Sequence, residues 1–392
     1  MIDSLRASRY RNLMITAVVI TAVALFPLLR PPLDGLVDDM ILALAYVVMA
    51  LGLNIVVGVA GLLDLGYVAF YAFGALCVGW LGSDHFSAIN GEKGIHVGVS
   101  EFQSLLAGIH LNWLLIVLAA IIVTAVAGMI IGLPTLRLRG DYIAIVTLAF
   151  GEIIGRFAQN GDEVKIGEYA FSNGRQSISP TDQINLPFYG EFNSALNLRP
   201  YYWVVLTLVV LVLFVNFRLR DSRLGRAWIA LREDEVAAAS MGIPLVKTKL
   251  LAYGIGAAFG GMSGAFLGSY LNSVNGIQFQ FGFSIFILAM VILGGLGSIW
   301  GVVIGAVALS FINSRLIPDV LDPALTDLDA GFTASQISFG VFGFLLVLMM
   351  VLRPEGILPE RRRQLELKEG IGTGETSGVG GGGGDPVVQA RA

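Results

Sequence analysis

Cysteine, histidine and charged residues are all scarce in this chain. Its 392 residues include one cysteine, Cys77, and three histidines, His85, His96 and His110. A single cysteine excludes internal disulfides and cysteine-based metal sites, and the histidines follow no metal-binding spacing, so we expect no metal site. Only 14% of the residues are charged, whereas soluble globular domains carry about 25%.

Apolar residues are correspondingly abundant. They make up 55% of the chain, and the mean hydropathy is +0.76, which is typical of an integral membrane protein. About ten apolar runs approach the roughly 20 residues that a helix needs to cross the hydrocarbon. They lie at 12–30, 40–58, 62–82, 112–133, 141–159, 201–217, 250–271, 282–297, 299–315 and 335–352. Because the runs lack the alternation of barrel strands, the sequence predicts an all-α, polytopic transmembrane helical bundle over residues 1–352.

The positive charges predict the orientation of these spans, since Lys and Arg favour cytoplasmic segments. Ten spans would put both termini in the cytoplasm, and we expect a bacterial inner (plasma) membrane. Two outer loops, 83–111 and 160–200, would then be long. The inner segments would hold Arg6, Arg9, Arg11, Arg137, Arg139, Arg218, Arg220, Arg223, Arg226, Arg232, Lys247, Lys249, Arg353, Arg361, Arg362 and Arg363, and the outer loops only Lys93, Lys165, Arg175 and Arg199.

The two ends of the chain and one internal turn have distinct patterns. The first run could be a signal peptide, although its apolar residues continue to Leu29, which favours an uncleaved span. Residues 353–392 form a predicted cytoplasmic tail, and its glycine-rich part beyond about 370 should be disordered. The sequence "GGLGS" at 294–298 joins two apolar runs without any charge, which indicates a tight turn or a helix break.

A charged, alanine-rich segment at 222–243 interrupts the apolar runs. Asp221 or Ser222 can cap a helix start, and Gly242 followed by Pro244 can end it about five turns later. Such a helix could be an interfacial anchor, a solvated connector or a docking helix for a cytoplasmic protein, and its capped form with a smooth alanine face favours docking. Its predicted apolar stripe consists of Leu224, Trp228 and Leu231.

Five segments resemble the permease subunits of branched-chain amino acid ABC importers, and more specifically the longer of the two permeases that such importers pair. One is "ALREDEVAAASMGIPLVKTKLLAYGIGAAFGGMSGAFLGSYL", which is similar to the cytoplasmic coupling loop and the span after it. The others are "LGLNIVVGVAGLLDLGYVAFYAFGA" (51–75), "LPTLRLRGDYIAIVTLAFGEIIGRF" (133–157), "MVILGGLGSIWGVVIGA" (290–306) and "LRPEGILPERRRQLELKEG" (352–370).

The resemblance implies a function for the charged segment. Glu235, Ala237, Ala238 and Gly242 match the coupling motif, which in the family seats in a cleft of the ATPase subunit. Arg226 and Leu231 of the same predicted helix are assigned to this ATPase-coupling set. The implied partners are a second permease subunit, two ATPase subunits and a periplasmic substrate-binding protein, within membrane lipid and with no nucleic acid.

The absence of a nucleotide-binding motif supports the assignment of ATP binding to partner subunits. The chain has no G-x-x-x-x-G-K-[ST] phosphate loop, because its Lys247-Thr248 pair follows valine. We therefore expect no cofactor in this chain, with ATP and magnesium bound by partner subunits. No histidine lies in an apolar run and no nucleophile with a base is visible, so we expect no enzyme activity. Two stretches, "FSNGRQSI" (171–178) and "SVNGIQFQF" (273–281), depart from the family pattern and bear on specificity or on docking of the binding protein.

Charged residues within the apolar runs need partners, because an ionised side chain at the helix centre costs ~2.5–3.5 kcal/mol on insertion scales. Glu152 and Arg156 are four residues apart and can pair, either as a structural ion pair or along a substrate path. The segment between Asn54 and Asp64 could be irregular, which is tolerated at depth only where the backbone is buried or lines a cavity. Our candidates for the substrate path are Asn54, Asp64, Tyr67, Thr147 and Glu152.

Two alternative functions stay open at this stage. An importer of the same type could carry urea or short amides instead of leucine, isoleucine or valine. A protein of another class, a proton-coupled secondary transporter, could use Glu152 and Asp64 as relay carboxylates and would need no ATPase.

Overall fold

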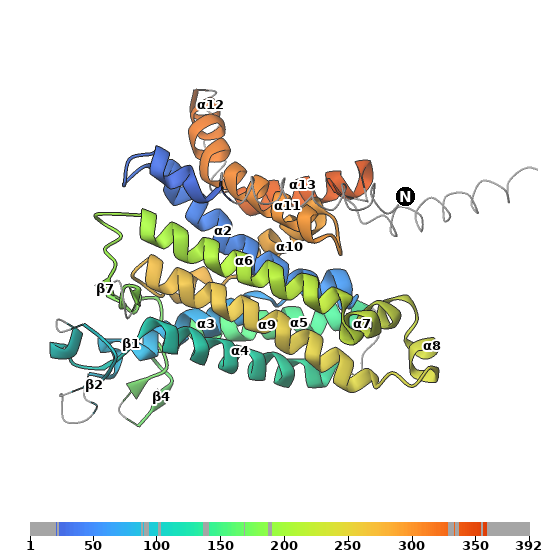
Figure 1. Ribbon diagram of the computed structural model, residues 1–392, viewed down its shortest axis with the longest axis horizontal. Coiled ribbons are helices and arrows are strands. Elements are labelled where there is room, and N and C mark those ends of the chain that lie inside the picture. Colours follow the sequence, from blue (N-terminus) through green and yellow to red (C-terminus); the bar gives the residue numbers. More distant parts are fainter. Residues whose placement is uncertain are drawn as a thin grey trace, which may run out of the picture.

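Long apolar helices that lie roughly side by side make up most of the computed structural model (Figure 1). Of the predicted run 12–30, only residues 21 and 23–30 belong to the described part, so that span lies largely outside it. The stretch beyond about 370 that was predicted to be disordered lies wholly outside it. The structure describes residues 21, 23–87, 89, 94–100, 103–135, 141–167, 169–186, 190–327, 333, 337–353 and 356–358.

The helices account for every predicted run from 40–58 onward. They are α2 (Gly35–Leu53), α3 (Val68–Leu81), α4 (Trp113–Thr135), α5 (Asp141–Gln159), α6 (Arg199–Asp221), α7 (Arg223–Glu233), α8 (Glu235–Ser240), α9 (Leu245–Tyr270), α10 (Phe281–Gly294), α11 (Ile299–Phe311), α12 (Asp322–Asp327) and α13 (Ser338–Leu352). Two π-helices, η2 (Asn54–Val59) and η6 (Ile312–Leu321), continue α2 and α11. Short 3-10 helices lie at Phe26–Leu29, Asp84–Phe86, Gln103–Leu105 and Gly276–Gln278.

Six helical segments of the described residues are long and apolar enough to cross a membrane. They are Gly35–Val59, Trp113–Thr135, Tyr142–Gln159, Arg199–Asp221, Leu245–Tyr270 and Ile299–Leu321. The helices α3, α10 and α13 are apolar but shorter. The all-α membrane bundle is therefore confirmed, while the number of crossings stays a prediction.

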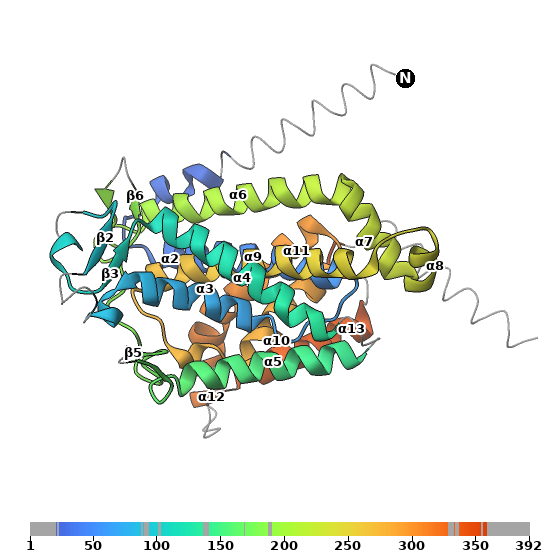
Figure 2. The ribbon, with the colours of Figure 1, turned by 90° about the horizontal axis from the view of Figure 1, so that it is seen from below.

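Helix α9 occupies the centre of the bundle, where it packs against α2, α3 and α4 (Figure 2). The close approach of α3 to α9 depends on Gly74 and Gly261, because a Cβ atom on Gly74 would collide with the backbone of Gly261. In a bilayer the hydrophobic effect does not drive helices together, because lipid tails are as apolar as the helices. Small residues allow the close backbone contacts that hold the helices together instead. Around this centre, α2 also contacts α6 and α11, and α10 lies between α11 and α13.

Irregular backbone lies beside the short helices. At 1.5 Å per residue, a 14-residue helix such as α3 or α10 spans about 21 Å, less than the ~30 Å hydrocarbon core. Helix α2 passes into η2, and the chain from Ala60 to Tyr67 is non-helical before α3 begins. Helix α10 ends at a turn in which Gly295 (φ +116°) and Gly297 (φ +84°) adopt the left-handed region that favours glycine. The predicted break at 294–298 is confirmed.

Short strands gather at one end of the bundle, here called the strand end, and α7 and α8 lie at the opposite end, the turn end (Figures 1 and 2). Strand β3 lies between β1 (antiparallel) and β2 (parallel), whereas β4–β5 and β6–β7 are antiparallel pairs. The strands are β1 (Gly82–Ser83), β2 (Ile95–Val97), β3 (Ile109–Leu111), β4 (Lys165–Ile166), β5 (Tyr169–Ala170), β6 (Asn185–Leu186) and β7 (Gly190–Glu191).

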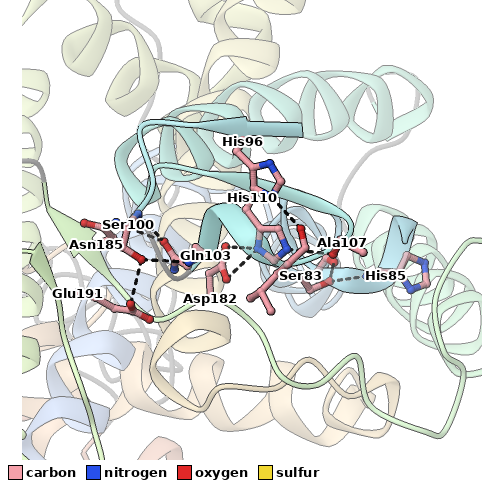
Figure 3. A network of polar contacts seen from close by, with 12 residues as sticks. Ser83, His85, His96, Ser100, Gln103, Ala107, His110, Asp182, Asn185 and Glu191 are labelled. Atoms are coloured by element: carbon pink, nitrogen blue, oxygen red, sulfur yellow. Dashed lines mark hydrogen bonds and ion pairs between the residues drawn. The ribbon is translucent and has the colours of Figure 1, made fainter. Parts of the chain in front are cut away.

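A buried ion pair joins the two long loops at the strand end (Figure 3). His110 is 2% exposed, and its Nδ1 lies 2.8 Å from Asp182 Oδ2, while its Nε2 lies 3.1 Å from the Ala107 carbonyl oxygen. Burial alone would lower the pKa of His110, but the hydrogen bond and negative charge of Asp182, with smaller contributions from Ala107 and Asp84, raise it above its ordinary value. The ring of His96 stacks on His110, with ring centroids 5.5 Å apart.

Candidate functional site

The segment predicted as one five-turn helix is two helices, so that prediction was wrong. Residues 222–243, here called the coupling turn, begin as expected with Ser222, whose side chain accepts the N–H of Gly225 at the start of α7. At Asp234 the backbone turns extended, with φ −153° and ψ 115°. The Asp234 carboxylate then accepts the N–H groups of Val236 (2.8 Å) and Ala237 (3.0 Å). This N-cap starts α8 in a new direction.

The apolar stripe of α7 holds the coupling turn against the bundle. Trp228 and Leu231 are 1% and 5% exposed, and the Trp228 indole Nε1–H donates to the Thr248 carbonyl oxygen of α9 at 2.8 Å. The stripe is confirmed as the packing face. Leu231, which we assigned to the ATPase-coupling set, therefore supports the turn from inside.

Arg232 connects α7 to the irregular segment after α2. Its guanidinium Nη1 donates to the Gly58 carbonyl oxygen of η2 at 2.7 Å. A Cβ atom on Gly61, a residue with φ +71°, would collide with the side chain of Arg232. Gly61 thus leaves room for the arginine side chain, which reaches the backbone of η2.

Glu235 is bound within this chain. Its Oε1 lies 2.6 Å from Nζ of Lys249, whose side chain is 4% exposed although that of Glu235 is 35% exposed. The pair connects α8 to α9 across the chain reversal at Gly242. Sequence reasoning grouped Lys249 with the inner-loop charges, because no periodic pattern relates residues 14 apart across a turn.

Apolar and small residues form part of the outward surface of the coupling turn, at α8 and the residues directly after it. Val236 is 64% exposed and Met241 is 84% exposed, and neither was among the predicted residues. Ala237 and Gly242 are exposed beside them, and Gly242 has the predicted left-handed conformation (φ +82°) with open space where a Cβ atom would lie. Ala238, by contrast, is 3% exposed and faces inward. The sequence did contain a signal for Val236 and Met241, since they are the two large apolar residues in a stretch of charged and small residues.

Arg226 lies apart from that tip. It is exposed on α7, where its Nη1 donates to the Asp221 carbonyl oxygen at 2.8 Å. The ATPase-coupling set is thus divided between outward residues (Arg226, Ala237, Gly242), inward residues (Leu231, Ala238) and one paired with α9 (Glu235).

The residues proposed for the substrate path do not share one site. Asn54 is fully buried, and its Oδ1 accepts the Gly297 N–H at 2.9 Å, which joins η2 to the glycine turn. Tyr67 is also fully buried, and its hydroxyl donates to the Gly256 carbonyl oxygen of α9 at 2.8 Å. The segment between these two residues is a π-helix followed by non-helical chain, so the predicted irregularity between Asn54 and Asp64 is confirmed.

Asp64 and Thr147 lie together at the start of α3. Asp64 is 2% exposed and its Oδ1 accepts the Gly66 N–H at 2.9 Å. The Thr147 hydroxyl accepts the Leu65 N–H at 3.0 Å and donates its only proton to the Ala144 carbonyl oxygen at 3.1 Å. The second oxygen of Asp64 has no hydrogen-bond partner among the described residues.

Glu152 points away from this group. Thr147 and Gly151 form the side of α5 that packs against Gly66. The Glu152 side chain is 43% exposed, on a different side of the helix, with its Oε2 3.7 Å from Arg156 Nε. The described structure therefore gives no support to a relay between Glu152 and Asp64.

The last described residues return to the glycine turn. The N–H groups of Ile357 and Leu358 donate to the carbonyl oxygens of Leu293 (2.9 Å) and Gly294 (3.1 Å). Segments that the sequence analysis matched separately to one family, 51–75, the coupling turn, 290–306 and the start of 352–370, are thus in contact at the turn end.

Comparisons with known proteins agree with this arrangement. Residues 35–351 match the family described as "Branched-chain amino acid transport system / permease component". The high-affinity branched-chain amino acid transport system permease protein LivM of Salmonella typhimurium is 36% identical over 381 residues, which cover 93% of this chain and 79% of the relative. No solved structure matches the chain.

Two further relatives are named LivM and LivH. The probable branched-chain amino acid transport permease protein LivM of Methanocaldococcus jannaschii is 26% identical, with 81% of this chain and 91% of the relative covered. LivH of Escherichia coli K12 is 24% identical, with 83% and 95% covered. The match over residues 35–351 and the apolar helices of the bundle show that this multi-pass membrane protein belongs to the permease component family of branched-chain amino acid transport systems.

Proposed function

We propose that this chain is a transmembrane permease subunit of an ATP-driven ABC importer for branched-chain amino acids, namely leucine, isoleucine and valine, and forms part of its translocation pathway. The names of its relatives support the substrate class. One structural observation carries the mechanism: the coupling turn is bound directly to segments inside the bundle. These bonds are Arg232 to Gly58, Trp228 to Thr248 and Glu235 to Lys249.

The proposal assigns ATP binding to other chains. Similarity to both LivM and LivH supports pairing with a second, related permease. Two ATPase subunits and a periplasmic binding protein complete the proposed importer, and this chain itself binds no cofactor and catalyses no reaction. The turn end faces the cytoplasm of a bacterial inner membrane in this proposal, because Arg218, Arg220, Arg223, Arg226 and Lys247 lie in or next to the coupling turn.

The exposed tip of the coupling turn is suited to an ATPase groove. The tip offers a small apolar surface at a short, capped helix, formed by Val236, Ala237, Met241 and Gly242. Helices commonly dock in the grooves of other proteins through such a surface. When the ATPase subunits close, this tip moves with them. Because α7 and α8 are fixed to α9 and η2, the displacement is transmitted to the bundle and alternates access to the pathway.

Charge substitution at the tip tests the proposal. Met241→Glu is matched with Leu105→Glu, because Met241 and Leu105 are 84% and 83% exposed and lie at opposite ends of the molecule. Each variant is reconstituted with the second permease, the ATPase subunits and the binding protein in sealed vesicles, and ATP-dependent uptake of radiolabelled leucine is measured. We expect Met241→Glu to lose most uptake and Leu105→Glu to retain it. Equal uptake by both variants contradicts docking at the tip.

The alternatives give different results in the same vesicles. Gly242→Trp and Glu235→Lys are also expected to abolish uptake while the protein remains in the membrane. A proton-coupled transporter would instead accumulate leucine without companion chains and would lose uptake when a protonophore is added at constant ATP. An importer of urea or short amides would accumulate radiolabelled urea or acetamide in the same vesicles and would take up little leucine.

A further inference from the structure

A polar cavity lies at the strand end of α5, away from the coupling turn. It has a volume of about 290 Å³, near the lower limit of pockets that hold small molecules. One wall is formed by the last turns of α5 and the other by the chain that leads into α10. The lining residues that matter here are Glu152, Arg156, Gln159, Phe279, Gln280 and Phe281.

The cavity contains an ion pair whose hydrogen-bonding capacity is largely unused. Arg156 Nε and Glu152 Oε2 are 3.7 Å apart, too far for a hydrogen bond, and the two side chains are 70% and 43% exposed. Among the described residues, neither the Gln159 amide nor the Gln280 amide has a hydrogen-bond partner. Four polar groups around one small cavity are therefore free to bind a ligand.

The position of this pair in a candidate spanning helix makes hydrocarbon an unfavourable neighbour for it. Glu152 and Arg156 belong to the apolar segment Tyr142–Gln159, where an ionised side chain facing hydrocarbon is costly. A surface i,i+4 pair contributes only about 0.3–0.5 kcal/mol to a helix, which does not offset the cost of exposing both charges to lipid. The pair must face water or polar groups, as it does in this cavity.

We propose that the cavity is a binding site for an α-amino acid zwitterion with an apolar side chain. The Arg156 guanidinium binds the ligand carboxylate, the Glu152 carboxylate binds its ammonium group, and the two glutamine amides complete the polar shell. The partly exposed ring of Phe281 contacts the apolar side chain, and Phe279, which is 1% exposed, supports this wall from within. This assignment rests on the proposed transport function and adds a site at the strand end, where a substrate would be received before it passes along the bundle.

Binding measurements on the assembled, detergent-purified importer without its binding protein test the site directly. Radiolabelled leucine is the probe, and leucinamide and 4-methylpentanoate are the competitors, because the first lacks the carboxylate and the second lacks the ammonium group. We expect each competitor to bind at least about tenfold more weakly than leucine, since a hydrogen bond to a charged group contributes this much or more. The variants are Arg156→Gln and Glu152→Gln, and the matched controls are Arg175→Gln and Glu163→Gln in exposed parts of the strand end.

The pattern of discrimination separates binding from folding. Arg156→Gln should remove the preference for leucine over leucinamide, and Glu152→Gln should remove the preference over 4-methylpentanoate, each with about tenfold weaker leucine binding. A merely structural pair would leave both preferences unchanged, and that result overturns the proposal. Saturable binding should also be present in the unmodified complex, so its absence in a complex that still imports leucine refutes the cavity and leaves the transport function intact. Failure of the unmodified vesicles to import leucine would refute the transport function itself.

Discussion

Replacing Glu235 by glutamine should destabilise the coupling turn more than removing both members of its ion pair. The substitution leaves the Lys249 ammonium, in a side chain 4% exposed, without the carboxylate that lies 2.6 Å away. Breaking a buried pair in this way costs about 3–5 kcal/mol. Because Glu235 is itself 35% exposed and a glutamine oxygen still accepts a hydrogen bond, we expect about 1–3 kcal/mol. The double variant Glu235→Gln with Lys249→Met removes the ammonium as well and should recover most of this loss.

Thermal unfolding of four purified proteins measures the comparison as a double-mutant cycle: the unmodified chain, Glu235→Gln, Lys249→Met and the double variant. A change of 1 kcal/mol shifts Tm by about 2–4 °C for domains of 150–250 residues, so the single variant should melt several degrees below the double variant. Glu163→Gln, at an exposed site, is the control and should not shift Tm. If the single and double variants melt at the same temperature, the ammonium does not depend on this carboxylate and the reasoning is refuted. ATP-dependent leucine uptake by the double variant separates the two roles of Glu235: normal uptake means that Glu235 acts only within this chain, and lost uptake at normal stability means that it also contacts the ATPase.

Three further predictions concern other parts of the fold. Gly74→Ala should lower the free energy of unfolding by about 1–3 kcal/mol, because the new Cβ atom meets the backbone of Gly261 and overpacks the helix contact. Thermal unfolding should show this as a lowered Tm. Asn54→Leu should lower the free energy of unfolding by about 1–3 kcal/mol, since the buried Gly297 N–H loses its acceptor. Denaturant unfolding measures this loss, and an unchanged unfolding midpoint would contradict it. The raised pKa of His110 means that its contact with Asp182 stabilises the strand end fully below the ordinary histidine pKa and is lost as pH rises through the higher folded value. The protection of the loop amides against hydrogen exchange, taken relative to the intrinsic exchange rate at each pH, should fall over that interval, and His110→Gln should remove this change in protection.

The helices could be predicted from the sequence because the membrane imposes one rule on each of them. A run of apolar residues long enough to cross must satisfy its own backbone, so hydropathy locates it. The predicted run 141–159 coincides with α5. The ends were less accurate where helices continue into polar sequence, as α6 does to Asp221 and α9 does from Leu245. There the stop depends on caps and neighbours, which hydropathy does not record.

The site was harder to predict because its contacts join distant residues. Ser222 and Gly242 were found from local capping rules, which act within a few residues. Asp234 was missed as a cap because it stands between two other acids, where charge alone does not indicate a change of direction. The partners of Arg232 and Glu235 lie across the fold, and no spacing along the chain predicts them.

The contacts at the turn end suggest why irregular backbone is placed there. Arg232 holds the Gly58 carbonyl of the π-helix, and the neighbouring Asn54 side chain holds the Gly297 N–H of the glycine turn. A Cβ atom on Gly58 would collide with both the Asn54 side chain and the Gly297 N. π-Helical turns occur often at functional sites, and a break in a helix can bend where a regular helix moves as a rigid body. A displacement of α7 therefore reaches two deformable segments through two hydrogen bonds, so the ends of α2, α10 and α11 can move together while the centre of the bundle around α9 remains packed.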